Sequence, residues 1–220
     1  TIVTESIDYL CDRLEKAPVE RFNAALQELL REEFHQHKRI IFNGDNYSNA
    51  WTEEAARRKL PNHLATMDAI RVLKNDDKKA IFARYGVYSL AELDSRFEVY
   101  LEEYHRKIRI EGEIGLEIAR SMIIPVVADE YCRLANALKL ASQDSLTAGV
   151  RGLRRSAEEL GWGLDDLYDK CDALETALTG LHEDIIAALA DLRTVVDALE
   201  YRIDDNRWPL PKYREMLFIY

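Results

Sequence analysis

The sequence predicts an all-α fold in which long antiparallel helices form a coiled-coil-like bundle, accompanied by short helices and one extended segment. Two observations lead to this prediction. The 220 residues contain only nine Gly and five Pro, so we expect few turns and long elements. Apolar side chains recur at spacings of three and four along most of the chain, as they do on one face of an α-helix.

Two amphipathic helices are predicted at the start of the chain. The first covers about 2–16 and ends at Ala17-Pro18, because the residue before a proline disfavours helical geometry. Its apolar face is formed by Ile2, Val3, Ile7, Leu10 and Leu14. The second covers about 19–37 and has an apolar stripe of Phe22, Leu26, Leu29, Leu30 and Phe34.

A distinctive loop follows these helices. Residues 38–42 resemble a short extended segment, and the run from Asn43 to Asn46, Asn-Gly-Asp-Asn, is a strong turn signal. Tyr47 and Trp51 stand four residues apart, and we expect these two aromatic side chains to pin the loop. We expect Thr52 to cap a short helix that is broken at Leu60-Pro61-Asn62. Two more short helices are predicted, one from Thr66 and one from Asn75 to Gly86.

Long helices are predicted for the second half of the chain. Ser89 and Glu92 form a capping box that starts a helix reaching about residue 141, which Pro125 should kink. Another helical region covers about 145–161 and ends at Gly161-Trp162-Gly163.

A heptad seam then extends over residues 167–199, and the pattern predicts one continuous helix. Such a stripe cannot remain exposed, so we expect it to pack along another long helix, such as the one that begins at Ser89. The seam residues alternate at spacings of four and three: Leu167, Cys171, Leu174, Leu178, Leu181, Ile185, Ala188, Leu192, Val195 and Leu199.

The chain is therefore divided into a helical region at 1–88, a long-helix bundle at 89–205 and a C-terminal tail at 206–220. The tail contains two prolines and six large apolar residues in its last thirteen positions, so we expect it to dock on a surface. Because the chain starts at Thr1 without a Met, we expect it to be part of a longer protein.

The formal net charge of −10 and the isoelectric point of about 5.1 argue against a nucleic-acid partner, which would need a basic patch. The three cysteines, Cys11, Cys132 and Cys171, lie far apart and are odd in number, so we expect reduced thiols. No signal peptide and no membrane-spanning run is visible. The expected location is cytoplasmic.

Few residues have the types and spacing that chemistry requires. His35 and His37, with Glu32 and Glu33, are the one cluster with metal-ligand residue types, and a solvated helix end explains them better. Asp45 lacks the pattern of a calcium loop. The sequence contains no phosphate-binding glycine loop, no Gly-x-Ser-x-Gly and no His-Glu-x-x-His. Its paired aspartates are typical of helix caps. We assign no catalytic, cofactor-binding or metal-binding residue.

Several landmarks, in order, resemble the C-terminal region of type III glutamine synthetases. They are Thr1 to Glu5, Phe42 to Ser48 with Trp51, Glu54 to Ala56, Leu60 to Asn62, Tyr85 to Val87 with Ser89, Glu92, Leu93, Ser95, Arg96 and Glu98 to Tyr104, and Trp208 to Pro211 with Tyr213, Met216, Leu217 and Phe218. They span nearly the whole chain, although 140–200 is matched only by its helical character.

The resemblance implies a parent enzyme that condenses glutamate and ammonia using ATP and Mg²⁺ or Mn²⁺, through a γ-glutamyl phosphate. It also implies assembly into double rings, so the expected partners are the catalytic domain of the same enzyme and neighbouring subunits. The catalytic motifs of that family would lie upstream of Thr1. The expected role of these 220 residues is thus structural, in support and oligomer assembly, with no cofactor of their own.

Two other interpretations remain open. The chain could be a stand-alone helical interaction module without an enzymatic parent. It could also be a small metalloprotein that uses His35 and His37.

Overall fold

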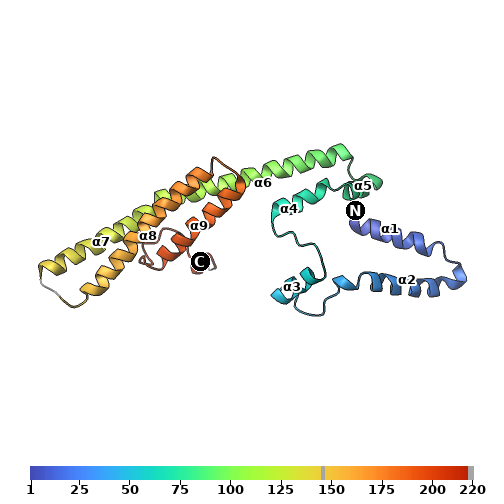
Figure 1. Ribbon diagram of the computed structural model, residues 1–220, viewed down its shortest axis with the longest axis horizontal. Coiled ribbons are helices and arrows are strands. Elements are labelled where there is room, and N and C mark those ends of the chain that lie inside the picture. The colour runs from blue at the N-terminus through green and yellow to red at the C-terminus, as the bar shows by residue number, and fades with distance from the viewer. Residues whose placement is uncertain (145–146, 218–220) are drawn as a thin grey trace. The chain divides into compact units, whose positions relative to one another are not determined.

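The computed structural model describes residues 1–144 and 147–217, and all regular secondary structure in these ranges is helical (Figure 1). The predicted all-α class is confirmed. The chain divides into two compact units, Thr1–Glu102 and Glu103–Tyr220, which we call unit 1 and unit 2. The division lies inside one helix, α6 (Leu90–Ile118).

Unit 1 consists mainly of short helices. After α1 (Ile2–Leu14) and α2 (Phe22–Gln36) come α3 (Asn49–Arg57), α4 (Thr66–Arg71), α5 (Asp76–Arg84) and the start of α6. Single 3₁₀ turns join them: η1 (Val19–Arg21), η2 (Lys38–Ile40) and η3 (Val72–Lys74). The two amphipathic helices predicted at the start of the chain are both present.

Two predictions about the loop after α2 were wrong. Residues 38–40 form the turn η2 instead of an extended segment, and α3 begins at Asn49 instead of after Thr52. The turn η2 is closed by the Ile40 N–H donating to the His37 carbonyl and the Ile41 N–H donating to the Lys38 carbonyl. Asp45 accounts for the earlier start of α3, because its carboxylate accepts the Tyr47 N–H at 2.9 Å and its carbonyl accepts the Ser48 hydroxyl at 2.6 Å. This compact turn leads directly into the helix, so Thr52 lies inside α3.

Side-chain caps form at the starts of α5 and α6, and the second of them is the predicted capping box. The Asn75 side chain accepts the Lys78 N–H at 3.2 Å at the start of α5. At the start of α6 the Ser89 hydroxyl accepts the Glu92 N–H at 3.2 Å, while the Glu92 carboxylate accepts the Ser89 N–H at 2.7 Å. Gly86 takes φ +60° between these helices, a conformation that glycine adopts without strain.

The long helix continues past Pro125 by widening one turn. The π-helical turn η4 (Ala119–Ile123) joins α6 to α7 (Ile124–Gln143), and the Ile124 N–H donates to the Ala119 carbonyl. Proline has no N–H and would clash with the preceding α-helical turn, so a wider turn just before it removes the conflict. The expected disturbance is therefore present as a π-helical turn.

The predicted seam helix was wrong in its length. α8 (Val150–Ala177) continues through Gly161 and Gly163, and the chain then reverses at Leu178–Leu181 before α9 (His182–Glu200). The Gly180 N–H donates to the Ala177 carbonyl at 2.9 Å in this turn. The two halves of the seam thus pack against each other within one hairpin, which buries them better than one exposed helix could.

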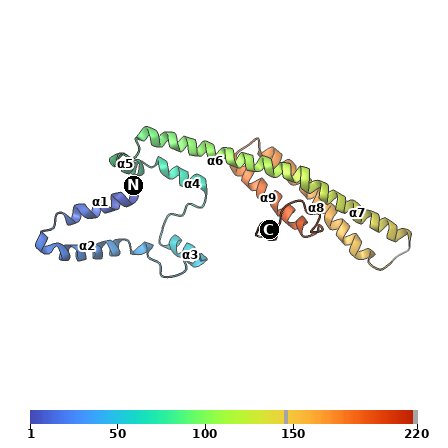
Figure 2. The ribbon, with the colours of Figure 1, turned by 180° about the vertical axis from the view of Figure 1, so that it is seen from behind.

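α8 also packs along α7, as both views of the ribbon show (Figures 1 and 2). The long partner expected for the seam is therefore the helix that begins after Ser89. Side chains of η4, α7, α8, α9 and the end of α6 contribute to the core of unit 2, which includes Ile123, Leu160, Leu167, Leu174 and Leu192.

Two glycines let α6 approach the α8–α9 hairpin closely. A Cβ on Gly112 would lie 2.8 Å from Ile185 Cγ2, and one on Gly115 would lie 2.6 Å from Leu189 Cδ1. The chain ends in a tail whose Trp208 is buried against the core and whose Leu210 packs beside it, followed by α10 (Tyr213–Leu217). Phe218, Ile219 and Tyr220, which the sequence assigned to the docked tail, lie outside the described residues.

Candidate functional site

The loop between α2 and α3 forms a compact structure that we call the aromatic corner, residues 41–58. The rings of Phe42 and Trp51 lie 4.8 Å apart, centroid to centroid, with a tilt of 33°. Gly44 lies under the Phe42 ring, where a Cβ would come within 2.6 Å of it. Of the two side chains expected to pin the loop, Trp51 packs on Phe42, whereas Tyr47 is fully exposed.

Arg58 holds the aromatic corner to the end of α2. Its Nη1 donates to the carbonyls of Arg39 at 3.0 Å and Ile41 at 2.8 Å, and its Nε donates to Glu54 Oε1 at 2.5 Å. This hydrogen bond from Arg58 lowers the pKa of the Glu54 carboxyl. The guanidinium also lies 5.8 Å from the centre of the Trp51 ring. Sequence reasoning missed this role, because the bonded carbonyls are distant in the chain.

An open depression beside the corner contains the candidate metal-ligating residue His35. It has a volume of about 630 Å³ and is lined by His35, Gln36, Lys38, Arg39, Ile41, Asn43 and Arg58. His37 Nε2 lies 3.3 Å from Glu33 Oε2, one helical turn away. Among the residues that the structure describes, no group of three or more His, Cys, Asp or Glu side chains is placed to hold a metal ion. The depression is basic, with no nucleophile and base paired in it.

The apolar faces of α1 and α2 are the most unusual surface of unit 1. Within residues 1–102, all of them described, three apolar side chains are buried: Leu29, Leu93 and Phe97. Val3 is 71% exposed and Phe34 is 64% exposed. Large side chains also stand exposed at Ile2, Ile7, Phe22, Leu30, Ile40 and Ile41. Exposed apolar surface on this scale is typical of a protein–protein contact.

Polar groups hold α1 and α2 together beside these faces. The Tyr9 hydroxyl donates to Glu33 Oε1 at 3.1 Å, and Arg13 Nη2 donates to Glu32 Oε2 at 2.6 Å. Arg13 also donates to the Tyr9 hydroxyl at 3.2 Å. These exposed contacts fix the geometry of the pair but contribute little stability, because water competes for the same groups. These contacts join α1 to α2 while the apolar side chains beside them stay exposed.

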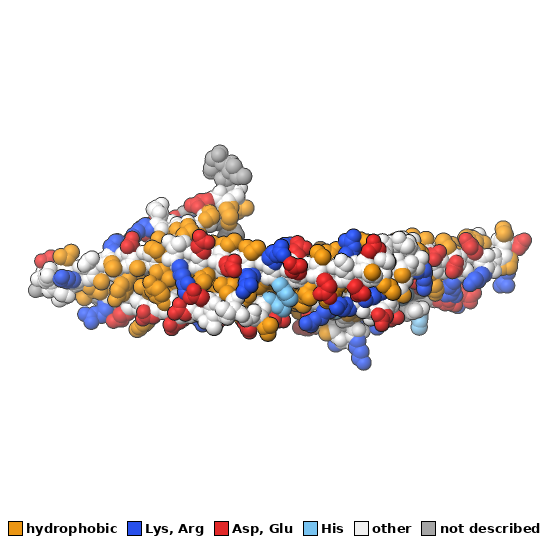
Figure 3. Space-filling view, turned by 90° about the horizontal axis from the view of Figure 1, so that it is seen from above, with side chains coloured by type: hydrophobic (Ala, Val, Ile, Leu, Met, Phe, Trp, Pro, Cys, Tyr) orange, Lys and Arg blue, Asp and Glu red, His pale blue; other side chains and the backbone are white. Residues whose placement is uncertain are grey.

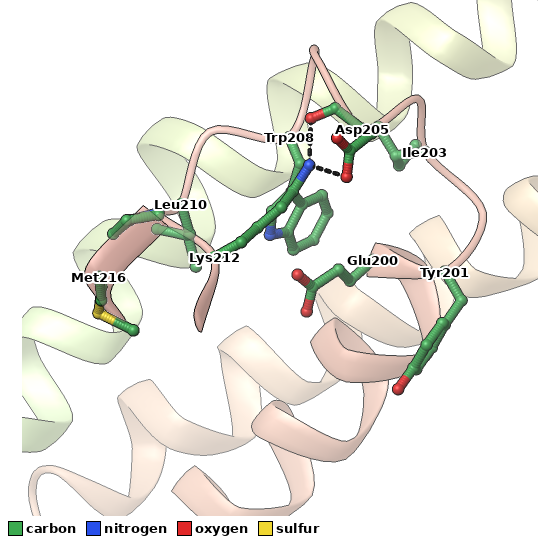
Figure 4. A pocket seen from close by; sticks show the side chains of 9 residues that line it. Glu200, Tyr201, Ile203, Asp205, Trp208, Leu210, Lys212 and Met216 are labelled. Atoms are coloured by element: carbon green, nitrogen blue, oxygen red, sulfur yellow. Dashed lines mark hydrogen bonds and ion pairs between the residues drawn. The ribbon is translucent and has the colours of Figure 1, made fainter. Parts of the chain in front are cut away.

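A cavity of about 680 Å³ lies in unit 2, where the tail folds over the end of α9 (Figure 4). The Trp208 indole projects into it from the tail, opposite Glu200 on α9. Lys212 forms an ion pair with Asp205 across the mouth and also donates to the Asp205 carbonyl. This pair joins the turn after α9 to the tail seven residues on, and so closes the loop that carries Trp208.

Comparison with known proteins identifies the family. The model of the glutamine synthetase C-terminal domain matches residues 25–142, more than half of the chain. The chain belongs to the glutamine synthetase C-terminal domain family. The matched range starts in α2, contains the aromatic corner and ends in α7. The resemblance that the sequence landmarks carried is confirmed.

Three curated glutamine synthetases are similar to this glutamine synthetase C-terminal domain. The enzyme of Butyrivibrio fibrisolvens is 32% identical over 207 residues, which cover 88% of this chain and 29% of the relative. The type-3 glutamine synthetase of Dictyostelium discoideum is 27% identical over 237 residues, covering 100% of this chain and 32% of the relative. The glutamine synthetase of Bacteroides fragilis is 28% identical over 211 residues, covering 88% and 29%. The chain spans about 30% of the length of these relatives.

A search for membrane spans gave a negative result. Over residues 1–144 and 147–217, no helix combines the length and the apolar composition that crossing a bilayer requires.

Proposed function

We propose that this glutamine synthetase C-terminal domain supports the assembly of a larger enzyme, with the apolar faces of α1 and α2 docked on its catalytic portion. The observation that carries the proposal is the small core of unit 1, in which Leu29, Leu93 and Phe97 are the buried apolar side chains among its described residues. A helix pair with so much apolar surface in water gains stability only when another surface covers it.

The parent protein would be an ATP-dependent glutamate–ammonia ligase that uses Mg²⁺ or Mn²⁺ and works in the cytoplasm. The support is the family membership and the named relatives, each about three times as long as this chain. In such an enzyme the catalytic portion would supply the substrate, ATP and metal sites. The C-terminal domain would contribute to contacts with that portion and with neighbouring subunits.

The aromatic corner supports this role because it sets the geometry at one end of the docking surface. Arg58 ties α3 to the backbone at the end of α2, next to the exposed Ile40 and Ile41. A rigid corner lowers the entropy that docking would cost, because its loop is ordered before the contact forms.

The first test is to read the gene upstream of Thr1. An in-frame sequence that encodes a glutamine synthetase catalytic portion is the expected result. A stop codon or an unrelated sequence would refute the proposal and would favour a stand-alone interaction module.

The second test measures the docking surface in the full-length gene product. Ile7→Asp with Phe34→Asp places two charges on the apolar faces of α1 and α2. We expect native mass spectrometry to show smaller assemblies and glutamine synthesis to fall at least tenfold. The matched control is Tyr47→Asp, a charge on a fully exposed side chain of the same unit. Unchanged assembly in the double variant would contradict the proposal.

A metal assay tests the remaining interpretation, a small metalloprotein that uses His35 and His37. Elemental analysis of the 220-residue chain should find less than stoichiometric metal, and His35→Ala with His37→Ala should leave its helical content unchanged. If the wild-type chain binds one equivalent of metal and the double variant binds none, the chain is a metalloprotein instead.

A further inference from the structure

A second surface, on unit 2, has a different character from the apolar faces of α1 and α2. A groove of about 470 Å³ runs between α7 and α8, which we call the α7–α8 groove. It is lined by Tyr131, Ala135, Leu138, Ser142, Arg154, Ala157, Glu158, Gly161, Trp162 and Asp165. The part of unit 2 that contains α7 and α8, at the left of Figure 3, shows apolar side chains among charged ones.

The groove lies on the side of α8 that faces away from α9. Two residues of α8 show where α9 lies. A Cβ on Gly163 would come within 2.6 Å of Leu199 Cδ2 on α9, and Glu159 Oε2 lies 3.4 Å from Arg202 Nε in the turn after α9. Gly161 lies two positions from Gly163 and therefore points to nearly the opposite side of the helix. α9 thus covers one face of α8 and leaves the α7–α8 groove open.

Small residues form the floor of the groove, and an exposed tryptophan stands at its edge. Ala135, Ala157 and Gly161 leave room for a side chain, and the Tyr131 ring packs over Gly161, where a Cβ would lie 3.2 Å away. Trp162 is 68% exposed. Tryptophan, tyrosine and arginine are the side chains that most often anchor protein–protein contacts, and all three line this groove.

On the outer side of α8, two exposed arginines precede two exposed aspartates. Arg151 and Arg154 lie near its start, while Asp165 and Asp169 lie farther along. All four side chains are exposed, and none forms an ion pair with another part of the chain that the structure describes. Arg154 and Asp165 are about 16 Å apart along the helix, at ~1.5 Å per residue, so they cannot pair with each other.

We propose that the α7–α8 groove binds the same groove of a second copy of this chain, with the two α8 helices antiparallel around a two-fold axis. We place the two-fold axis near residue 160 of each α8, so that a residue faces the partner residue that lies equally far on the other side of 160. This register pairs Arg154 with the partner's Asp165. The same register pairs Arg151 with the partner's Asp169, so one alignment satisfies both pairs. The two-fold axis repeats them, giving four ion pairs.

The same register also accounts for the apolar residues. Trp162 of each copy faces Ala157 and Glu158 of the other, above the floor of small residues. The product is a four-helix arrangement of two α7–α8 hairpins, a common way to bury helix faces. Glu158 lies near the axis beside its own counterpart and is the groove charge that opposes the pairing.

This inference names one contact between copies, on unit 2, that the proposed support role leaves open, and it involves no catalytic portion. It is tested with the 220-residue chain by sedimentation velocity over a concentration series. The wild-type chain should form a dimer that weakens as salt rises, because the ion pairs at the rim are exposed.

Charge reversal makes the test specific to the groove. Arg151→Glu with Arg154→Glu, and separately Asp165→Arg with Asp169→Arg, should each weaken self-association at least tenfold. An equimolar mixture of the two double variants should restore dimers that contain one copy of each, because the reversed charges then face opposite charges. Glu158→Gln should tighten the dimer, and Asp166→Arg, an exposed neighbour outside the groove, should leave it unchanged.

Three results would overturn the proposal. These are a wild-type chain that stays monomeric, reversed variants that associate like the wild type, or a mixture that forms no mixed dimers. Circular dichroism of each variant should match the wild type, and mixed-dimer formation itself demonstrates that both reversed variants are folded. None of these outcomes depends on the docking of unit 1, so this inference and the proposed function can fail separately.

Discussion

Glu130 offers the sharpest test of how the tail is held on unit 2. Its side chain is 4% exposed, on α7, and accepts hydrogen bonds from two arginines. Arg207 Nη1 donates to Glu130 Oε2 at 2.6 Å and comes from the turn just before Trp208. Arg133 donates with Nε to Glu130 Oε2 at 3.0 Å and with Nη2 to Oε1. We therefore expect Glu130→Gln to loosen the tail.

The magnitude follows from the number of bonds and the exposure of the partners. Hydrogen bonds to a charged group contribute ~1.5–3 kcal/mol each. The expected loss of stability in Glu130→Gln is smaller than the sum of these contributions. The Arg207 side chain is 37% exposed, so its guanidinium can hydrogen-bond to water in the variant. We expect about 2 kcal/mol, and at ~2.1 cal/mol/K of unfolding entropy per residue a unit of this size should melt roughly 8 °C lower.

The assay follows Trp208 fluorescence during thermal and urea unfolding, in a background with Trp51→Phe and Trp162→Phe. Glu111→Gln, an exposed carboxylate on α6, is the matched control and should change neither midpoint. If Glu130→Gln melts together with the wild type, the buried ion pairs do not hold the tail and the reasoning is refuted.

The pH dependence gives a second check on Glu130. The Arg133 hydrogen bond lowers the pKa of the Glu130 carboxyl below its ordinary value, despite burial, which acts in the opposite direction. A lowered pKa in the folded state means that the stability is present above the unfolded pKa and is lost as the pH falls through the folded pKa. The difference between wild type and variant should thus be constant from pH 5 to 8 and shrink in more acidic solution.

Three further predictions concern packing. Leu192→Asp should destabilise unit 2 by about 3–5 kcal/mol in urea unfolding, because it buries an unpaired charge in the core, and an unchanged midpoint would contradict this. Gly112→Val should destabilise unit 2 by about 1–3 kcal/mol through overpacking against Ile185, measured in the same way. Arg58→Ala should increase amide hydrogen exchange in residues 39–58, whereas Tyr47→Ala should not; equal exchange in both variants would refute the role of Arg58 in the aromatic corner.

The family and the helical class could be recognised from local signals. The capping box at Ser89 depends on residues three positions apart and forms as the sequence predicts, and the helix predicted from Asn75 starts there with a cap of the same spacing. The loop after Phe42 likewise identified the family, because its residue order is distinctive without any knowledge of its contacts. These features depend on interactions between residues that are close in the chain, so a short stretch of sequence is enough to predict them.

The contacts of the aromatic corner could not be predicted from residue spacing. Tyr47 and Trp51 have the spacing of neighbours on a helix, but the turn made by Asp45 leaves Tyr47 in solvent and brings Phe42 to Trp51 instead. Arg58 could not be assigned its role, since the carbonyls it bonds are 17 and 19 residues away.

Patterns among neighbouring residues account for the all-α class, most of the helix starts and the presence of a long apolar seam. The reversal of this seam at Leu178–Leu181, which brings Cys171 and Leu174 into the same core as Ile185 and Leu192, is a result of tertiary packing. A heptad pattern specifies which side chains need to be buried, and both a long helix and a hairpin satisfy it. The choice depends on how much surface each arrangement buries against α6 and α7, and that quantity belongs to the packed molecule.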